Sequence, residues 1–312
     1  MRAVLRRVGA ALFIGAAFYF LGRALVDQRE QLAAFDWSVE PIGLAASLVA
    51  LVAVLAGGVA IWASVLRHLG HRVRFLDLLR IWFLSSLGRY IPGKIWQFVG
   101  VAEMSRASGI PALVGITSLM AYMALAAAAA ALVGVYLLPA AAFGALGDVV
   151  PWLRASAPLL LLSVHPKFFN AALGVVSRLT RRPLGEWTAG WLDGVVLVGM
   201  CALMWLGFGV AFQLFIGSVA ETTALQFPAL TATYALSFLA GYAAVIAPAG
   251  LGAKDGAMAV LLVAALDVPL GVAAALALAA RVWSVAGDVL PALILLRARR
   301  EARAESNTVT LT

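Results

Sequence analysis

The amino-acid sequence predicts an all-α polytopic membrane protein with about six spanning helices and two re-entrant helical hairpins of opposite orientation, an arrangement typical of inverted-repeat transporters. Hydrophobic residues make up 63% of the 312 residues and charged residues 12%, against about 45–50% and about 25% in soluble domains. Several apolar runs reach the roughly 20 residues that cross a bilayer. Two further apolar regions are interrupted by proline and glycine beside positive charges.

Six apolar runs are predicted to span the membrane, at about 8–26, 41–66, 111–138, 151–164, 191–216 and 270–296. Proline opens four regions at or near the first turn, where its missing N–H costs nothing. The fourth run is short for a span. The first run resembles a signal peptide, but it is long and lacks a tight small-residue cleavage site, so we interpret it as a retained helix. Residues 1–298 are expected to form a single transmembrane domain, and residues 299–312 a polar cytoplasmic tail without fixed structure.

Basic residues set the expected orientation, because Lys and Arg beside a span collect on the cytoplasmic side. One topology gathers most of them on one face; they are Arg2, Arg6, Arg7, Arg67, Arg72, Arg74, Arg80, Lys167, Arg178, Arg181, Arg182, Arg297, Arg299, Arg300 and Arg303. The opposite loops carry mainly acids, with Arg29 and Arg154 as exceptions. The sequence therefore predicts a multi-pass protein of a cell (inner) membrane with both termini in the cytoplasm.

Two apolar regions do not fit a simple span. Residues 75–88 are too short to cross and are followed by Pro92-Gly93, and residues 227–247 run into the sequence PAGLGAKDG before a short helical piece at 257–266. The predicted topology attaches the first region to the cytoplasmic side and the second to the external side. A backbone break at depth survives only inside protein or beside a watery cavity. Paired breaks in two halves point to a substrate site between inverted repeats.

Cations accompany both predicted breaks. The first break contains Arg89, Tyr90, Pro92, Gly93 and Lys94, and the second contains Pro248, Gly250, Gly252, Lys254 and Asp255. Proline and glycine permit the reversal, and a helix starting after it directs its positive dipole end back at the break. A phosphate is the natural occupant of such a site. The alternatives are juxtamembrane cations at the first break and a local Lys254–Asp255 ion pair at the second.

Arg281 lies near the middle of the last predicted span, where an unpaired guanidinium is costly. It needs a partner, and Asp288 follows two turns later on the same helical face, so both can point into the bundle. Two interpretations remain open for Arg281: a salt bridge between this helix and a hairpin, and a direct contact with a lipid headgroup.

Other chemistry is not expected. His68 and His71 stand three apart but lack further ligands for a metal site, and neither a cofactor fingerprint nor a hydrolase, P-loop or zinc-protease motif occurs. An amphipathic helix on the cytoplasmic leaflet is predicted within 165–185. We expect the membrane and an anionic lipid as partners and no nucleic acid; a homo-oligomer or a separate membrane enzyme is left open.

With LGRYIPGKIWQ before the third span and APAGLGAKDGAMAVLL before the last, the chain resembles the lysylphosphatidylglycerol synthase transmembrane-region family, or flippase-like domain proteins. The resemblance covers nearly the whole chain. It implies movement of phospholipids or lipid-linked sugars between leaflets, without the aminoacyl transfer of members that carry a synthase domain. Ala249 and Lys254 stand where the family has Gly and often Arg. The alternatives are a non-transporting lipid-binding scaffold and an intramembrane glycosyl-transfer enzyme using Asp255 and Asp288.

Overall fold

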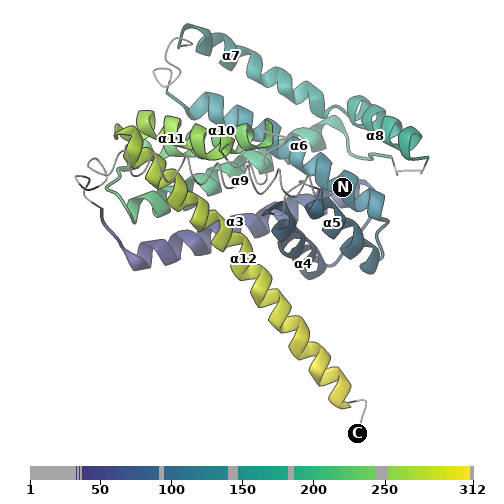
Figure 1. Cartoon of the computed structure of the whole chain (residues 1–312). Coiled ribbons are helices and arrows are strands. Elements are labelled where there is room, and N and C mark those ends of the chain that lie inside the picture. Colours follow the sequence, from purple (N-terminus) through teal and green to yellow (C-terminus); the bar gives the residue numbers. More distant parts are fainter. Residues whose placement is uncertain are drawn as a thin grey trace, which may run out of the picture.

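The protein is a bundle of helices (Figure 1). The structure, a computed structural model, describes residues 37–90, 95–139, 147–181, 186–243 and 252–309 together with Ala33 and Phe35, and this part of the chain contains no strand. The predicted first span, 8–26, lies outside the described residues, as do both predicted reversals, 91–94 and 244–251. The all-helical fold class is confirmed.

Within the described residues, four helices are long and apolar enough to cross a membrane. They are α3 (Pro41–His68), α6 (Ala112–Leu137), α9 (Trp191–Gly217) and α12, whose apolar part is Leu270–Ala298. Their bounds follow the predicted spans 41–66, 111–138, 191–216 and 270–296 within a few residues. The agreement is close because each run is uniformly apolar, and a helix satisfies every backbone hydrogen bond within its own segment.

The predicted span 151–164 is not one long helix. It forms α7 (Val150–Ser156) and the 3₁₀ helix η3 (Ala157–Val164), and α8 (Pro166–Thr180) follows at an angle of 63°. Prolines at the starts of η3 and α8 remove the backbone donors that a continuous helix would need. At most this segment is one broken span, so the described residues contain four or five candidate spans. Figure 1 shows α7 and α8 on the outside of the bundle.

Pairs of short helices lie between the long ones. The first short-helix pair consists of α4 (Phe75–Ser86), the 3₁₀ turn η1 (Leu87–Tyr90) and α5 (Trp96–Ala107). The second consists of α10 (Phe227–Ala243), which follows the 3₁₀ turn η4 (Ala224–Gln226), and α11 (Ala253–Leu266). In each pair the two helices pack against one another. The order long, short, short, long therefore occurs twice along the chain.

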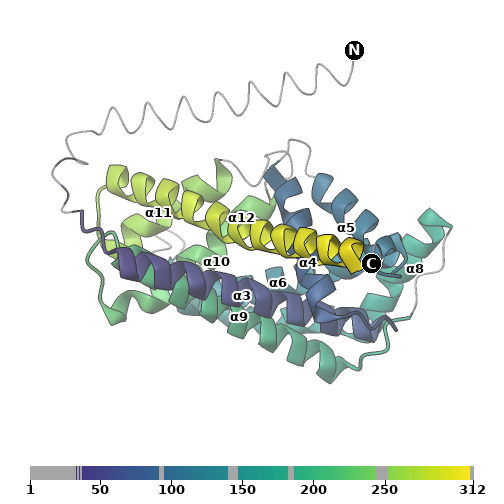
Figure 2. The same ribbon diagram turned by 90° about the horizontal axis from the view of Figure 1, so that it is seen from below.

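α3 and α9, the first long helix of each set, are antiparallel. The Glu40 amide at the start of α3 donates to the Ser218 carbonyl at the end of α9 (2.9 Å), and the Thr188 amide just before α9 donates to the His68 carbonyl at the end of α3 (3.1 Å). Figure 2 shows these helices running alongside one another, with α4 and α5 toward one end of the bundle and α10 and α11 toward the other. The two short-helix pairs thus approach the middle from opposite ends.

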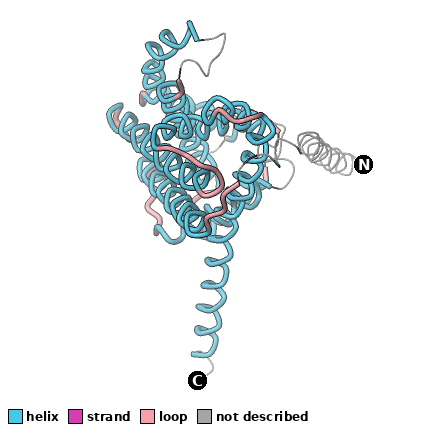
Figure 3. Tube along the Cα trace, turned by 90° about the vertical axis from the view of Figure 1, so that its left-hand side faces the viewer, coloured by secondary structure: helices cyan, strands magenta, loops and turns pink. Residues whose placement is uncertain are grey.

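α12 extends beyond the bundle. Its helix continues from Leu270 to Val309, through most of the segment predicted to be an unstructured tail, and its last turns project away from the other helices (Figures 1 and 3). Inside the bundle α12 packs against α11, α3 and α4. Gly287 lets α12 approach Leu51 of α3, and Trp283 donates its indole N–H to Ser47 of α3 (3.1 Å). These contacts hold the face that carries Arg281 and Asp288 toward the centre.

Candidate functional site

A cavity of about 610 Å³ lies where the two sets of helices meet. Side chains of all eight long and short helices, α3 to α6 and α9 to α12, line it. The size falls within the roughly 300–1,000 Å³ of small-ligand sites. Most of the lining is apolar, and its charged side chains are Arg89, Lys254, Asp255, Arg281 and Asp288.

Half of the sequence-predicted site residues meet at this cavity. Its lining includes Arg89 and Tyr90 of the first short-helix pair, Lys254 and Asp255 of the second, and Arg281 and Asp288 of α12. Gly252 is not in the lining; it caps the start of α11. Pro92, Gly93, Lys94, Pro248 and Gly250 lie outside the described residues. The structure thus brings together three segments that are far apart in the sequence.

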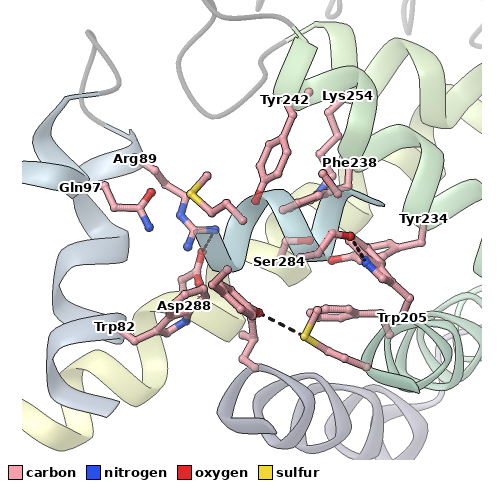
Figure 4. A pocket seen from close by; sticks show the side chains of 18 of the residues that line it. Trp82, Arg89, Gln97, Trp205, Tyr234, Phe238, Tyr242, Lys254, Ser284 and Asp288 are labelled. Carbon is pink, nitrogen blue, oxygen red and sulfur yellow. Dashed lines mark hydrogen bonds and ion pairs between the residues drawn. The ribbon is translucent and has the colours of Figure 1, made fainter. Parts of the chain in front are cut away.

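Asp288 binds the end of the first short-helix pair. Tyr90 donates its hydroxyl to Asp288 Oδ2 (2.6 Å), and Arg89 Nη1 lies 3.5 Å from the same oxygen. The 3₁₀ turn η1 presents these neighbouring residues together, and Arg89 Nη2 also donates to the Ser86 hydroxyl (2.7 Å). Figure 4 shows the Arg89 guanidinium facing Asp288. Since Asp288 is only 3% exposed, this pairing neutralises a carboxylate that would be very costly alone in an apolar interior.

Asp255 connects the second short-helix pair to α12. Its Oδ2 accepts from Arg281 Nη1 (2.5 Å) and from the Gly252 backbone amide (3.2 Å), so the carboxylate also caps α11. Of the interpretations left open for Arg281, the structure contains a salt bridge, from α12 to α11 of the second short-helix pair. The local Lys254–Asp255 ion pair considered from the sequence is wrong, because the Asp255 carboxylate is turned to Arg281. The start of α11, expected to attract a phosphate, is already occupied by this carboxylate.

Both attachment points lie at mid-depth of the longest helix. Arg281 is eleven residues after Leu270 and Asp288 ten residues before Ala298, the ends of the apolar part of α12. With a rise of about 1.5 Å per residue, the two side chains are about 10 Å apart along the helix axis. The two short-helix pairs therefore reach the same central stretch of α12, one through a cation and the other through a carboxylate.

Lys254 has a different environment. Its ammonium lies 5.1 Å from the centroid of the Tyr234 ring and 5.9 Å from that of Phe238. Within the described part of the chain it makes no salt bridge. Tyr242 stands one helical turn beyond Phe238 on α10 and also lines the cavity, as Figure 4 shows. Cation–π contacts stabilise an ammonium by about 0.5–2 kcal/mol, which does not replace a counter-ion in an apolar interior.

The aromatic wall of the cavity is not among the features predicted from the sequence. Tyr234, Phe238 and Tyr242 recur every four residues on α10, a spacing that puts all three on one face. That regular spacing was available in the sequence, whereas Trp82, Tyr122 and Trp205 come from three other helices and carried no local signal. In the described residues no group of three or more His, Cys, Asp or Glu side chains could hold a metal ion.

The apolar helices, the central cavity and its paired charges define a multi-pass helical membrane protein with four or five candidate spans in the described residues. Comparison of the chain with models of protein families, with curated proteins and with solved structures finds no match.

Proposed function

We propose that the protein is a flippase-like transporter that moves an anionic phospholipid or a lipid-linked sugar between the leaflets of a cell (inner) membrane, with both termini in the cytoplasm. The observation that carries the proposal is the convergence of Arg89, Tyr90, Lys254, Asp255, Arg281 and Asp288 on one cavity at mid-depth of α12. The charged side chains of this largely apolar cavity offer a lipid headgroup a path between the helices, while the acyl chains stay in the bilayer.

The two short-helix pairs act in this proposal as re-entrant hairpins of an inverted repeat. Suppose that α3, α4, α5 and α6 correspond in order to α9, α10, α11 and α12. Every packed pair among these eight helices then has a counterpart, apart from the pair of α3 and α9, which is its own counterpart. The matching contacts are α3–α4 and α9–α10, α4–α5 and α10–α11, α5–α6 and α11–α12, α3–α6 and α9–α12, α4–α12 and α10–α6, and α3–α12 and α9–α6. The antiparallel α3 and α9 supply the inversion. A central site between such repeats is the usual position for transported substrate.

The resemblance to the flippase-like family supports the same proposal. The residues that carry it include Arg89 and Tyr90 at one break, Lys254 and Asp255 at the other, and Arg281 in the last helix, all of which line the cavity. Motif positions that are far apart in sequence thus have a shared location, which is what a common ligand would require.

The alternative functions fit less well. A scaffold that only bound lipid at its surface would need no central cavity, and dry packing of the hairpins would suffice. A glycosyl-transfer enzyme would need a carboxylate free to act as a base or nucleophile. Asp255 and Asp288, the only carboxylates among the described lining residues, each accept a hydrogen bond and pair with an arginine.

Reconstitution tests the proposal. The liposomes carry a fluorescent short-chain phosphatidylglycerol in both leaflets, and added dithionite reduces only the label in the outer leaflet. When the protein is present, lipid from the inner leaflet is expected to reach the outer leaflet, so that dithionite reduces its label as well. Arg281→Ala should slow this movement by at least about tenfold, because it removes the α12 end of the second attachment. Lys254→Met should do the same without removing a salt bridge.

The matched control is Lys167→Met on α8, an exposed lysine outside the cavity. Each variant is used only after it elutes as a single species in size-exclusion chromatography. Wild-type protein that leaves half of the label protected, or Arg281→Ala and Lys254→Met variants as fast as the wild type, would contradict transport through this cavity.

A further inference from the structure

The charges that line the cavity do not balance. Three cations and two carboxylates are present among its described lining residues, so a single positive charge is left in excess. The two arginines are each paired, Arg89 with Asp288 and Arg281 with Asp255. The excess therefore belongs to Lys254, whose ammonium faces the rings of Tyr234 and Phe238 instead of a carboxylate.

The other groups that would hold an anion are already taken. The amide at the start of α11 donates to Asp255, and so does Arg281. An arriving anion that displaced Asp255 would leave that carboxylate buried without its partners, a costly arrangement in an apolar site. Among the described residues, the cavity thus offers one positive charge without a carboxylate partner, on Lys254.

The other lining residues that the structure describes supply no second uncompensated charge. The remaining described lining is uncharged: it includes the rings of Trp82, Tyr122, Trp205, Phe208 and Tyr242, methionine, leucine and alanine side chains, and the polar Gln97 and Ser284. A second negative charge on a ligand would remain without compensation among the described residues, and burying an uncompensated charge is strongly unfavourable. A phosphodiester carries one negative charge, whereas a phosphomonoester carries about −1.5 to −2 at neutral pH.

We propose that the cavity selects lipids whose headgroup carries one net negative charge on a phosphodiester, and that Lys254 contacts this phosphate. This inference rests on the proposed function of the cavity as a headgroup site. The volume of about 610 Å³ accommodates a headgroup and its glycerol backbone. Lipids that end in a phosphomonoester, diphosphate-linked lipids and zwitterionic lipids are bound more weakly.

Binding of short-chain lipids to the purified full-length protein in a neutral maltoside detergent tests this selectivity. The probes are dihexanoyl phosphatidylglycerol with one negative charge, dihexanoyl phosphatidic acid with nearly two, and zwitterionic dihexanoyl phosphatidylcholine. The wild type should bind phosphatidylglycerol at least about tenfold more tightly than the other two, equivalent to about 1.4 kcal/mol. Glycerophosphoglycerol, the same phosphodiester without acyl chains, should bind more weakly than phosphatidylglycerol.

Variants that change the charge sharpen the test. Lys254→Met should weaken phosphatidylglycerol binding about tenfold and remove the preference over phosphatidylcholine, while Lys254→Arg should retain both. Lys254→Met should also be at least as stable as the wild type, because it removes an unpaired ammonium from an apolar site. Asp288→Asn keeps an oxygen for the Tyr90 hydroxyl but adds one net positive charge, so it should shift the preference toward phosphatidic acid.

Several results would overturn the inference: equal or tighter binding of phosphatidic acid or phosphatidylcholine by the wild type, full binding by Lys254→Met, no binding of any probe, or glycerophosphoglycerol as tight as the lipid. These results are distinct from failure of the proposed function. Selective binding without movement of lipid in liposomes would refute transport alone, and movement of lipids irrespective of their charge would refute the selectivity alone.

Discussion

The two short-helix pairs reach the same stretch of α12, but they attach to it in opposite ways. The first contributes a cation and a hydroxyl, Arg89 and Tyr90, to the carboxylate of Asp288. The second contributes the carboxylate of Asp255 to the guanidinium of Arg281. Their glycines differ as well. Gly88 allows the backbone of α5 to pack closely against η1. Gly252 allows a positive φ of 82° at the start of α11. Both pairs consist of two short helices packed together, whereas the side chains that attach them to α12 differ.

The long helices that follow each pair show the same contrast. α6 contains no charged residue, and α12 carries both Arg281 and Asp288 within its apolar part. Both attachments therefore depend on a single helix. A movement of α12 would act on both short-helix pairs together. A substitution in one pair, in contrast, changes only the attachment of that pair.

The largest effect is expected from the Arg281–Asp255 pair. The atoms lie 2.5 Å apart and both side chains are largely buried, and removing one partner of a buried pair costs about 3–5 kcal/mol. Asp255→Leu and Arg281→Met should each lower the free energy of unfolding in SDS titration by about this amount. The double variant Asp255→Leu/Arg281→Met should recover part of the loss. A double variant as unstable as the two losses added together would indicate that the residues do not act as a pair.

A smaller loss is expected at the first attachment. Asp288→Ala removes the acceptor of the Tyr90 hydroxyl and the partner of Arg89, whose side chain is 25% exposed and therefore keeps some access to polar surroundings. We expect the free energy of unfolding to fall by about 1–3 kcal/mol. Asp288→Asn should lower the free energy of unfolding by less, because its amide oxygen can still accept a hydrogen bond from the Tyr90 hydroxyl. Equal losses in the two variants would show that the hydrogen bond contributes nothing.

Gly88 tests the close approach in the first pair. A Cβ at this position would lie 2.7 Å from the Trp96 carbonyl carbon and the Gln97 amide nitrogen, which are backbone atoms that cannot move alone. Gly88→Ala should lower the free energy of unfolding by about 2 kcal/mol, in the range for overpacking. The control is Gly199→Ala on α9, where nothing lies within 4 Å. Similar melting temperatures for Gly88→Ala and the wild type would mean that α5 is not held against η1.

Gly252 tests the backbone at the start of α11 and should have the smallest effect. Its φ of 82° and ψ of −51° lie in a region that residues with a Cβ avoid. Gly252→Ala is expected to cost about 1–2 kcal/mol, although a Cβ would meet no atom within 4 Å. Gly256→Ala, four residues later in α11 and equally uncrowded, should be neutral or stabilising. A pair of variants with the same stability would contradict the backbone explanation.

The sequence by itself determined the four long helices and singled out the charged residues that line the cavity. Uniformly apolar runs have one low-energy solution in a bilayer, so α3, α6, α9 and α12 could be predicted to within a few residues. The run at 151–164 was misjudged because its hydropathy fits a span while its prolines interrupt the helix. Arg281 and Asp288 stood out because charges in an apolar helix are costly and need a purpose.

Only the tertiary structure decided which charges pair and where the cavity lies. Arg281 has Asp288 two turns away on its own helix, yet each binds a different short helix. Local spacing contains no information on that choice, because the partners are brought together by contacts between helices up to about 200 residues apart in sequence. For the same reason the sequence could not show which aromatic rings surround Lys254, or that this lysine is the one cation without a carboxylate partner among the described lining residues. Both depend on the packing of α10, α11 and α12.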